Sequence, residues 1–186
     1  MFTALDPAIR RYRLTVDDVE RMVESGILAE DARVELVEGE LVAVSPQGPE
    51  HSGGKGVLAQ LLRRAHPDAY LREQDPLRCG DHSLPEPDLA VVRGRPQDYM
   101  RRHPRGDEAI LVVEISRTSQ RLDRRKASVY AGAGVPEYWW IDQVARRVTV
   151  HREPSAGGYA QVHVADENGE LELGGGTRCL VRELLP

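Results

Sequence analysis

The sequence has few cysteines, few aromatic residues and no long hydrophobic run. Its two cysteines, Cys79 and Cys179, form no Cys-x-x-Cys pair, which argues against a disulfide scaffold and against a thiolate zinc site. No stretch approaches the roughly 20 apolar residues of a membrane-spanning helix, and the first residues lack the apolar core of a signal peptide. We therefore expect a cytoplasmic protein with no membrane segment.

The net charge of -5 gives the chain no overall attraction to a polyanion, which weighs mildly against nucleic-acid binding. The distribution of charge points the other way. Residues 117–126 hold five cations and one acid, a local charge of +4, and a second basic run holds Arg101, Arg102 and Arg105. Each run is either a solvated face, as most charge runs are, or a surface for phosphates.

The hydrophobic pattern predicts an α/β fold, a mixed β-sheet flanked by helices. We expect one domain over residues 1–186, with a core at about residues 30–152. The pattern predicts no structure for the Gly-rich tail, residues 165–186. The expected helices are at 15–26, from about 53 to 62, and 121–133, and the expected strands are at 33–37, 40–44, 69–73, 89–92, 110–113, 138–141, 147–151 and 159–164.

Two acids flank apolar runs that have the length of buried strands. Asp88 precedes the run at residues 89–92, and Glu114 follows the run at residues 110–113. An isolated buried charge is costly, so such carboxylates are solvated, paired or metal-bound. If the strand ends converge, the two carboxylates form the hard oxygen site that Mg²⁺ or Mn²⁺ prefers. The alternative is two surface acids at unrelated strand ends, and the pattern alone leaves both open.

The order of several short motifs resembles a known family. Asp88 and Glu114-Ile115-Ser116 resemble the catalytic motif of the PD-(D/E)XK nuclease superfamily, and residues 34–150 resemble the Uma-two family of predicted endonucleases. The matching pieces are Glu35-Leu36-Val37-Glu38-Gly39-Glu40-Leu41, Ser45-Pro46 with His51, Pro87-Asp88, Val113-Glu114-Ile115-Ser116, Asp123-Arg124-Arg125-Lys126, Tyr130 and Gly134-Val135-Pro136-Glu137-Tyr138-Trp139. The resemblance implies a restriction-endonuclease-like fold and a metal held by Asp88, Glu114 and the Ile115 carbonyl. The turn and hydrophobic patterns add an N-terminal helix at residues 15–26, a hairpin at 33–44 and a C-terminal hairpin at 147–164.

Ser116 stands where the superfamily motif has a lysine, and a hydroxyl cannot supply the positive charge of that lysine. The resemblance implies that Lys126, on the next helix, supplies it. The alternative is an exposed lysine paired with Asp123 at i,i+3, worth a few tenths of a kcal/mol, and helical spacing alone favours this alternative. In the catalytic interpretation, Lys126→Met keeps folding and metal binding but lowers cleavage by a factor of roughly 10²–10³.

Four other side chains are candidates for the site. Glu35 alternates with apolar neighbours, so it either enters the cleft, to bind a second metal or orient Lys126, or faces solvent. His51 either contacts substrate or makes a structural hydrogen bond at a helix start. The adjacent Trp139 and Trp140 either stack on bases or place at least one ring in the core.

The function we expect is Mg²⁺- or Mn²⁺-dependent hydrolysis of nucleic acid, with DNA as the expected substrate. Asp88, Glu114 and Lys126 are its catalytic residues, and Arg117, Gln120, Arg121 and Arg124 contact the phosphate backbone. Two alternatives remain open. One is an inactive nuclease-fold module that binds nucleic acid, which Ser116 favours. The other is a structural homodimer without nucleic acid, which the net acidity favours, although active nucleases also form homodimers.

Overall fold

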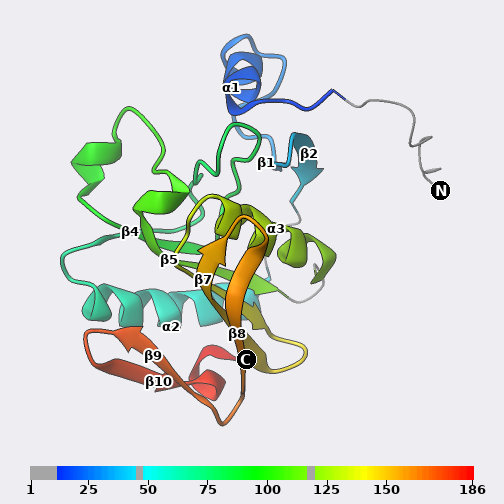
Figure 1. The fold of residues 1–186 in the computed structure, drawn as a ribbon. Helices are drawn as coiled ribbons and strands as arrows, with labels where there is room; N and C mark the ends of the chain where they lie inside the picture. Colours follow the sequence, from blue (N-terminus) through cyan, green and yellow to red (C-terminus); the bar gives the residue numbers. More distant parts are fainter. Residues whose placement is uncertain (1–11, 45–47, 117–119) are drawn as a thin grey trace.

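The computed structural model, shown in Figure 1, describes residues 12–44, 48–116 and 120–186. Up to residue 166, its helices and strands follow the order that the hydrophobic pattern predicts. In chain order they are α1 (Val16–Glu24), β1 (Val34–Val37), β2 (Glu40–Ala43), α2 (Pro49–Ala65), β3 (Tyr70–Arg72), β4 (Leu89–Val92), the 3-10 turns η1 (Pro96–Tyr99) and η2 (Gly106–Glu108), β5 (Ala109–Ser116), α3 (Gln120–Gly132), β6 (Glu137–Asp142), β7 (Arg147–Ser155), β8 (Gly158–Asp166), β9 (Glu170–Gly174), β10 (Thr177–Leu180) and the 3-10 turn η3 (Val181–Leu184).

A six-stranded mixed sheet forms the centre of the fold, with the strand order β3-β4-β5-β6-β7-β8. Only β5 and β6 pair in parallel, and every other neighbouring pair in this sheet is antiparallel. Parallel neighbours need a crossover connection, and α3 lies between β5 and β6 in the chain. The C-terminal end of β5 therefore leads directly into the start of α3.

Side chains alternate between the two faces of the sheet, and each face has its own apolar core. Leu111 and Trp139 point into the core on one face, together with residues of α2, β9, β10 and η3. Val112 and Trp140 point into the other core, where α3 contributes Tyr130. Continuous apolar strands such as β4, buried at every position, are typical of a sheet covered on both faces. In Figure 1, α2 runs between the sheet and the β9–β10 hairpin.

The N-terminal part follows the predicted caps and turns. Thr15 and Asp18 form a capping box at the start of α1, as the sequence predicts. The β1–β2 hairpin turns at Glu38 and Gly39, which both have positive φ. Gly39 also lies against Arg13, and a Cβ at position 39 would approach the Arg13 Cβ to 2.6 Å, so the turn needs glycine.

The expected fold class is confirmed, with corrections to several boundaries. The Gly-rich tail, for which the pattern gave no structure, forms β9, β10 and η3. Its apolar residues Leu171, Leu173 and Leu184 pack into the core beside α2, a tertiary contact that local periodicity does not reveal. α2 begins at Pro49, before the two glycines, and Val57 is exposed rather than on its buried face. Among the described residues, no helix is long and apolar enough to cross a membrane.

Candidate active site

Asp88 and Glu114 lie side by side on neighbouring strands. Leu89 of β4 pairs with Val113 of β5 in the antiparallel ladder, so the two acids occupy the next position along it, and opposite residues share a face. The Ile115 N–H donates to Asp88 Oδ2 at 2.8 Å, and both acids are buried. The interpretation as two unrelated surface acids is therefore wrong. Glu114 does not end its strand, however, because β5 continues to Ser116.

Lys126 points from α3 into this acidic group. Its Nζ donates to Glu114 Oε1 at 2.9 Å and lies 2.6 Å from Glu35 Oε2. Only 4% of the residue is exposed, so the interpretation as an exposed surface lysine is wrong. Burial alone would lower the pKa of Lys126, but the charges of Glu114 and Glu35 outweigh burial and the net shift is upward. The residue therefore carries its charge in the interior. Lys126 and Lys55 are the only lysines of the sequence, whose other basic side chains are arginine or histidine.

Glu35 comes from the β1–β2 hairpin and is buried, so it does not face solvent. Its contact with Lys126 lacks the angles of a regular hydrogen bond and is an ion pair. Burial raises the pKa of the Glu35 carboxyl to about 7, while the charge of Lys126 opposes the rise and that of Glu114 adds to it. The hairpin therefore supplies a second counter-charge to Lys126.

Tyr130 is a member of this group that the sequence reasoning assigned no role. Its hydroxyl donates to Glu114 Oε1 at 2.7 Å, and the residue is fully buried. Burial raises the pKa of the Tyr130 hydroxyl well above its usual value, and the Glu114 charge adds to that shift. Its spacing could have revealed it, because residues four apart lie on the same face of a helix. Lys126 and Tyr130 have that spacing on α3.

His51 lies in the first turn of α2 and reaches the other acid. Its Nε2 lies 2.9 Å from Asp88 Oδ1. Burial lowers the pKa of the His51 imidazole, and the charge of Lys55, one turn along α2, lowers it further. This contact matches the interpretation of His51 as a hydrogen-bonding residue at a helix start, with a carboxylate of the site as its partner.

Ser116 does not take over the role of the motif lysine. Its Oγ accepts a hydrogen bond from Trp140 Nε1 at 2.7 Å. Trp139 and Trp140 are 1% and 7% exposed, so both rings belong to the cores, and the interpretation as a base-stacking pair is wrong.

The expected phosphate contacts lie mostly outside the described residues. Arg117 is in the undescribed stretch, and the side chains of Gln120, Arg121 and Arg124 are not described either. Arg125 belongs to the same basic run, and its side chain is described. Its guanidinium bonds Glu38 at 2.9 Å and Glu40 at 3.4 Å, which ties α3 to the β1–β2 hairpin.

The oxygen atoms at this place fit a hard divalent cation. Within the described ranges, no three His, Cys, Asp or Glu side chains gather closely enough to enclose an ion. Mg²⁺, however, is usually held by one or two carboxylates and completes its shell with water and substrate phosphate. Asp88 and Glu114 supply the carboxylates. The N–H and C=O of a strand residue point to the same side, so the Ile115 carbonyl shares the side on which its N–H meets Asp88. In the described part of the chain, both hydrogen bonds to Glu114 fall on Oε1, which leaves Oε2 for a cation.

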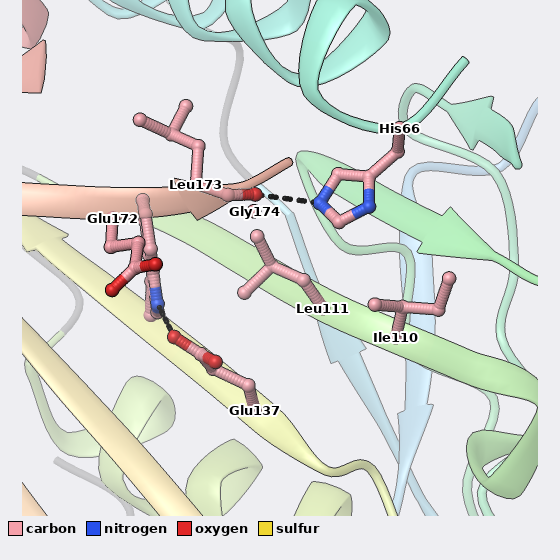
Figure 2. Close-up of a pocket in the computed structure, with 8 residues that line it drawn as sticks. His66, Ile110, Leu111, Glu137, Glu172, Leu173 and Gly174 are labelled. Atoms are coloured by element: carbon pink, nitrogen blue, oxygen red, sulfur yellow. Dashed lines mark hydrogen bonds between the residues drawn. The ribbon is translucent and has the colours of Figure 1, made fainter. Parts of the chain in front are cut away.

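A cavity of about 100 Å³ lies elsewhere, at the start of β5 on the opposite face (Figure 2). Neither the two acids Asp88 and Glu114 nor their partners Lys126, Glu35 and His51 line it. Its lining residues are His66, Ile110, Leu111, Glu137, Trp139, Glu172, Leu173 and Gly174. The His66 ring is hydrogen-bonded to the Leu173 carbonyl, and Trp139 Nε1 donates a hydrogen bond to Glu137. These polar groups of the cavity therefore already have partners inside the chain.

Comparisons with known proteins agree with this architecture. Residues 16–178 match the family model described as "Uma2: Putative restriction endonuclease". Among solved structures, the chain is similar to "a putative nuclease belonging to DUF820" from Anabaena variabilis, with a TM-score of 0.74 and 19% identity over 92% of this chain and 97% of that one. At this identity the similarity concerns the fold. A search of the curated proteins found no match.

Proposed function

Because the chain belongs to the Uma2 family, we propose that it is a metal-dependent endonuclease that hydrolyses phosphodiester bonds in nucleic acid. The observation that carries this proposal is the buried ammonium of Lys126, 2.9 Å from Glu114. A lysine held in the interior beside a carboxylate pair is costly for a purely structural purpose. Perturbed charged groups of this kind gather at functional sites.

Asp88, Glu114 and the Ile115 carbonyl are the residues that would hold Mg²⁺ or Mn²⁺. Such a cation polarises the phosphoryl group and lowers the pKa of a bound water. The Ile115 N–H keeps Asp88 at its place through the 2.8 Å hydrogen bond to Oδ2, and His51 orients Asp88 from the other oxygen. Backbone and imidazole thus fix the carboxylate before any cation arrives.

Lys126 takes the role that Ser116 cannot take. Its ammonium is a compact point charge on a flexible stem, so it can turn from Glu114 toward an oxygen of the scissile phosphate. There it stabilises the negative charge that develops on the phosphoryl group during attack by water. Glu35 holds the ammonium at the site between turnovers, so we assign it the role of orienting Lys126 rather than that of binding a second metal.

The proposed substrate is DNA, gripped through its backbone by Arg117, Arg121 and Arg124, with Gln120 also near phosphate. Such contacts are independent of sequence and weaken with added salt. A cation is necessary for DNA to bind at the carboxylates of this site. Without one, Asp88 and Glu114 would repel the phosphate.

The test is nicking of supercoiled plasmid with Mg²⁺, with Mn²⁺ and with EDTA. The wild type should nick only with metal, and Asp88→Asn and Lys126→Met should lower the rate by about 10² or more. Arg178→Met is the matched control, because it removes an exposed cation that pairs with Glu170 on the β9–β10 hairpin. It should cleave like the wild type.

The alternatives give different results. Metal-independent DNA binding without nicking would replace the proposal with an inactive binding module. Neither binding nor nicking, with a stable dimer in solution, would favour a structural homodimer.

A further inference from the structure

Helix α3 directs two hydrogen-bond donors to a single oxygen atom. Lys126 Nζ and Tyr130 Oη donate to Glu114 Oε1 at 2.9 and 2.7 Å. The two donors are four residues apart, one turn of the helix. Loss of either one alone leaves the oxygen with the other.

The two donors differ in how freely they can move. Tyr130 is fully buried, and its ring lies 5.1 Å from that of Tyr138. The Tyr130 carbonyl also accepts a hydrogen bond from the Val135 N–H at 3.0 Å, which fixes the end of the helix. Lys126, by contrast, carries its ammonium on a four-carbon stem with several rotatable bonds. The tyrosine is therefore the fixed donor and the lysine the mobile one.

The ammonium of Lys126 contacts two carboxylates, and it must leave Glu114 when it turns to the substrate in the reaction proposed above. In the structure it lies between Glu35 and Glu114. When it turns to a phosphate oxygen, it leaves Glu114 with one donor fewer. An unheld carboxylate in the interior would rotate and would bind a cation less well, since the partners that orient a ligand contribute to metal affinity.

We propose that Tyr130 is a positioning residue for the metal, which keeps the Glu114 carboxylate oriented while Lys126 is engaged with the substrate. By holding Oε1, the hydroxyl leaves Oε2 directed to the cation throughout the reaction. The proposal rests on the proposed nuclease function of this site. It assigns Tyr130 no contact with the substrate or the reacting atoms.

The test is a double-mutant cycle of Tyr130→Phe and Lys126→Met, read out as Mn²⁺ affinity by electron paramagnetic resonance. With Lys126 present, Tyr130→Phe should weaken Mn²⁺ binding only about threefold or less, because the ammonium still holds Oε1. With methionine at position 126, the same change should weaken it about 10–100-fold. Equal small effects in both backgrounds would overturn the proposal and leave Tyr130 a purely structural role.

Tyr159→Phe is the matched control. Tyr159 belongs to the same group of rings, 6.3 Å from Tyr138, but its hydroxyl donates to the Val135 carbonyl at 2.9 Å rather than to Glu114. Its loss should leave Mn²⁺ affinity unchanged in both backgrounds. A weakening equal to that of Tyr130→Phe would mean that general loosening of the cluster causes the effect, which would also overturn the proposal.

A second measurement covers the case in which the Lys126→Met protein does not fold. In Tyr130→Phe alone, the Mn²⁺ concentration that gives half-maximal nicking should rise, while the rate at saturating Mn²⁺ stays near that of the wild type. A lower rate at every Mn²⁺ concentration would contradict a positioning role. The two proposals fail separately. Nicking with unaltered metal dependence in Tyr130→Phe would refute only the role of Tyr130, and coupled Mn²⁺ binding without nicking would refute only the nuclease.

Discussion

Replacing Lys126 with methionine removes the ammonium that lies 2.6 Å from Glu35 and 2.9 Å from Glu114. All three side chains are at least 90% buried, so water cannot replace the lost charge. Breaking a buried ion pair by removing one partner costs about 3–5 kcal/mol. That is a large part of the roughly 5–15 kcal/mol by which a domain is stable. The expectation from sequence, that Lys126→Met keeps folding nearly intact, is therefore revised, and a marked loss of stability should accompany the loss of cleavage.

The size of this loss should depend on pH through Glu35. Burial already raises the pKa of Glu35 to about 7 from an ordinary 4.5, and loss of the lysine charge should raise it further. A raised pKa in the folded state gives stability that is complete below the unfolded pKa and is lost as the pH rises through the folded pKa. Below pH 7 the protonated carboxyl limits the cost of the substitution. The difference between wild type and variant should therefore be larger at pH 8 than at pH 6.

Urea unfolding followed by tryptophan fluorescence measures this difference, because Trp139 and Trp140 are buried. The companion variant Glu35→Gln/Lys126→Met removes one of the two uncompensated carboxylates and should be more stable than Lys126→Met at pH 8. Equal stability of Lys126→Met and wild type at pH 8 would show that the ion pairs of Lys126 do not stabilise the fold. A double variant no more stable than the single one would show that Glu35 is not the uncompensated charge.

Two further predictions concern the fold. Hydrogen bonds from Arg102 hold the pKa of Glu108 at about 2, so their stabilisation is present above about pH 4.5 and is lost as the pH falls toward 2. Glu108→Gln should cost on the order of 1 kcal/mol at pH 7, a value reduced by solvent screening, and should flatten acid unfolding; an unchanged acid profile would contradict this. A Cβ on Gly106 would lie 2.5 Å from the Ala133 Cβ, so Gly106→Ala should destabilise by about 1–3 kcal/mol. Gly53→Ala, where the helix leaves open space, should instead stabilise by about 0.5–1 kcal/mol, and thermal unfolding of both variants checks the pair.

Much of the sheet could be predicted because its signals are local. The apolar runs at residues 89–92 and 110–113 predict β4 and β5. The acids at the ends of these runs, Asp88 and Glu114, are therefore recognisable as candidates for the site. Helical spacing alone favours an exposed Lys126 paired with Asp123, which is not where the structure places it. Its target could only be expected through the family resemblance, since no local pattern shows which strand end a helix faces.

Contacts between segments far apart in the chain could not be predicted from the sequence. The orientation of Glu35 was left open, because its burial depends on how the β1–β2 hairpin docks against α3, through Arg125 and the acids of the turn. The contact of His51 with Asp88 joins residues 37 positions apart. The role of Tyr130 was missed for a different reason. Its spacing of four residues from Lys126 places it on the same face of α3, but a tyrosine on a buried helix face is usually core, and the position of its hydroxyl beside Glu114 is what shows the role.

An anomalous diffraction map from a crystal soaked in Mn²⁺ tests the proposed metal site most directly. We expect one peak that lies about 2.1 Å from each of three oxygen atoms, namely a carboxylate oxygen of Asp88, a carboxylate oxygen of Glu114 and the carbonyl oxygen of Ile115. We also expect Tyr130 to keep its hydrogen bond to Glu114 Oε1 in that crystal. An occupied Mn²⁺ site elsewhere on the chain, with no peak between Asp88 and Glu114, would contradict the proposed metal-dependent nuclease.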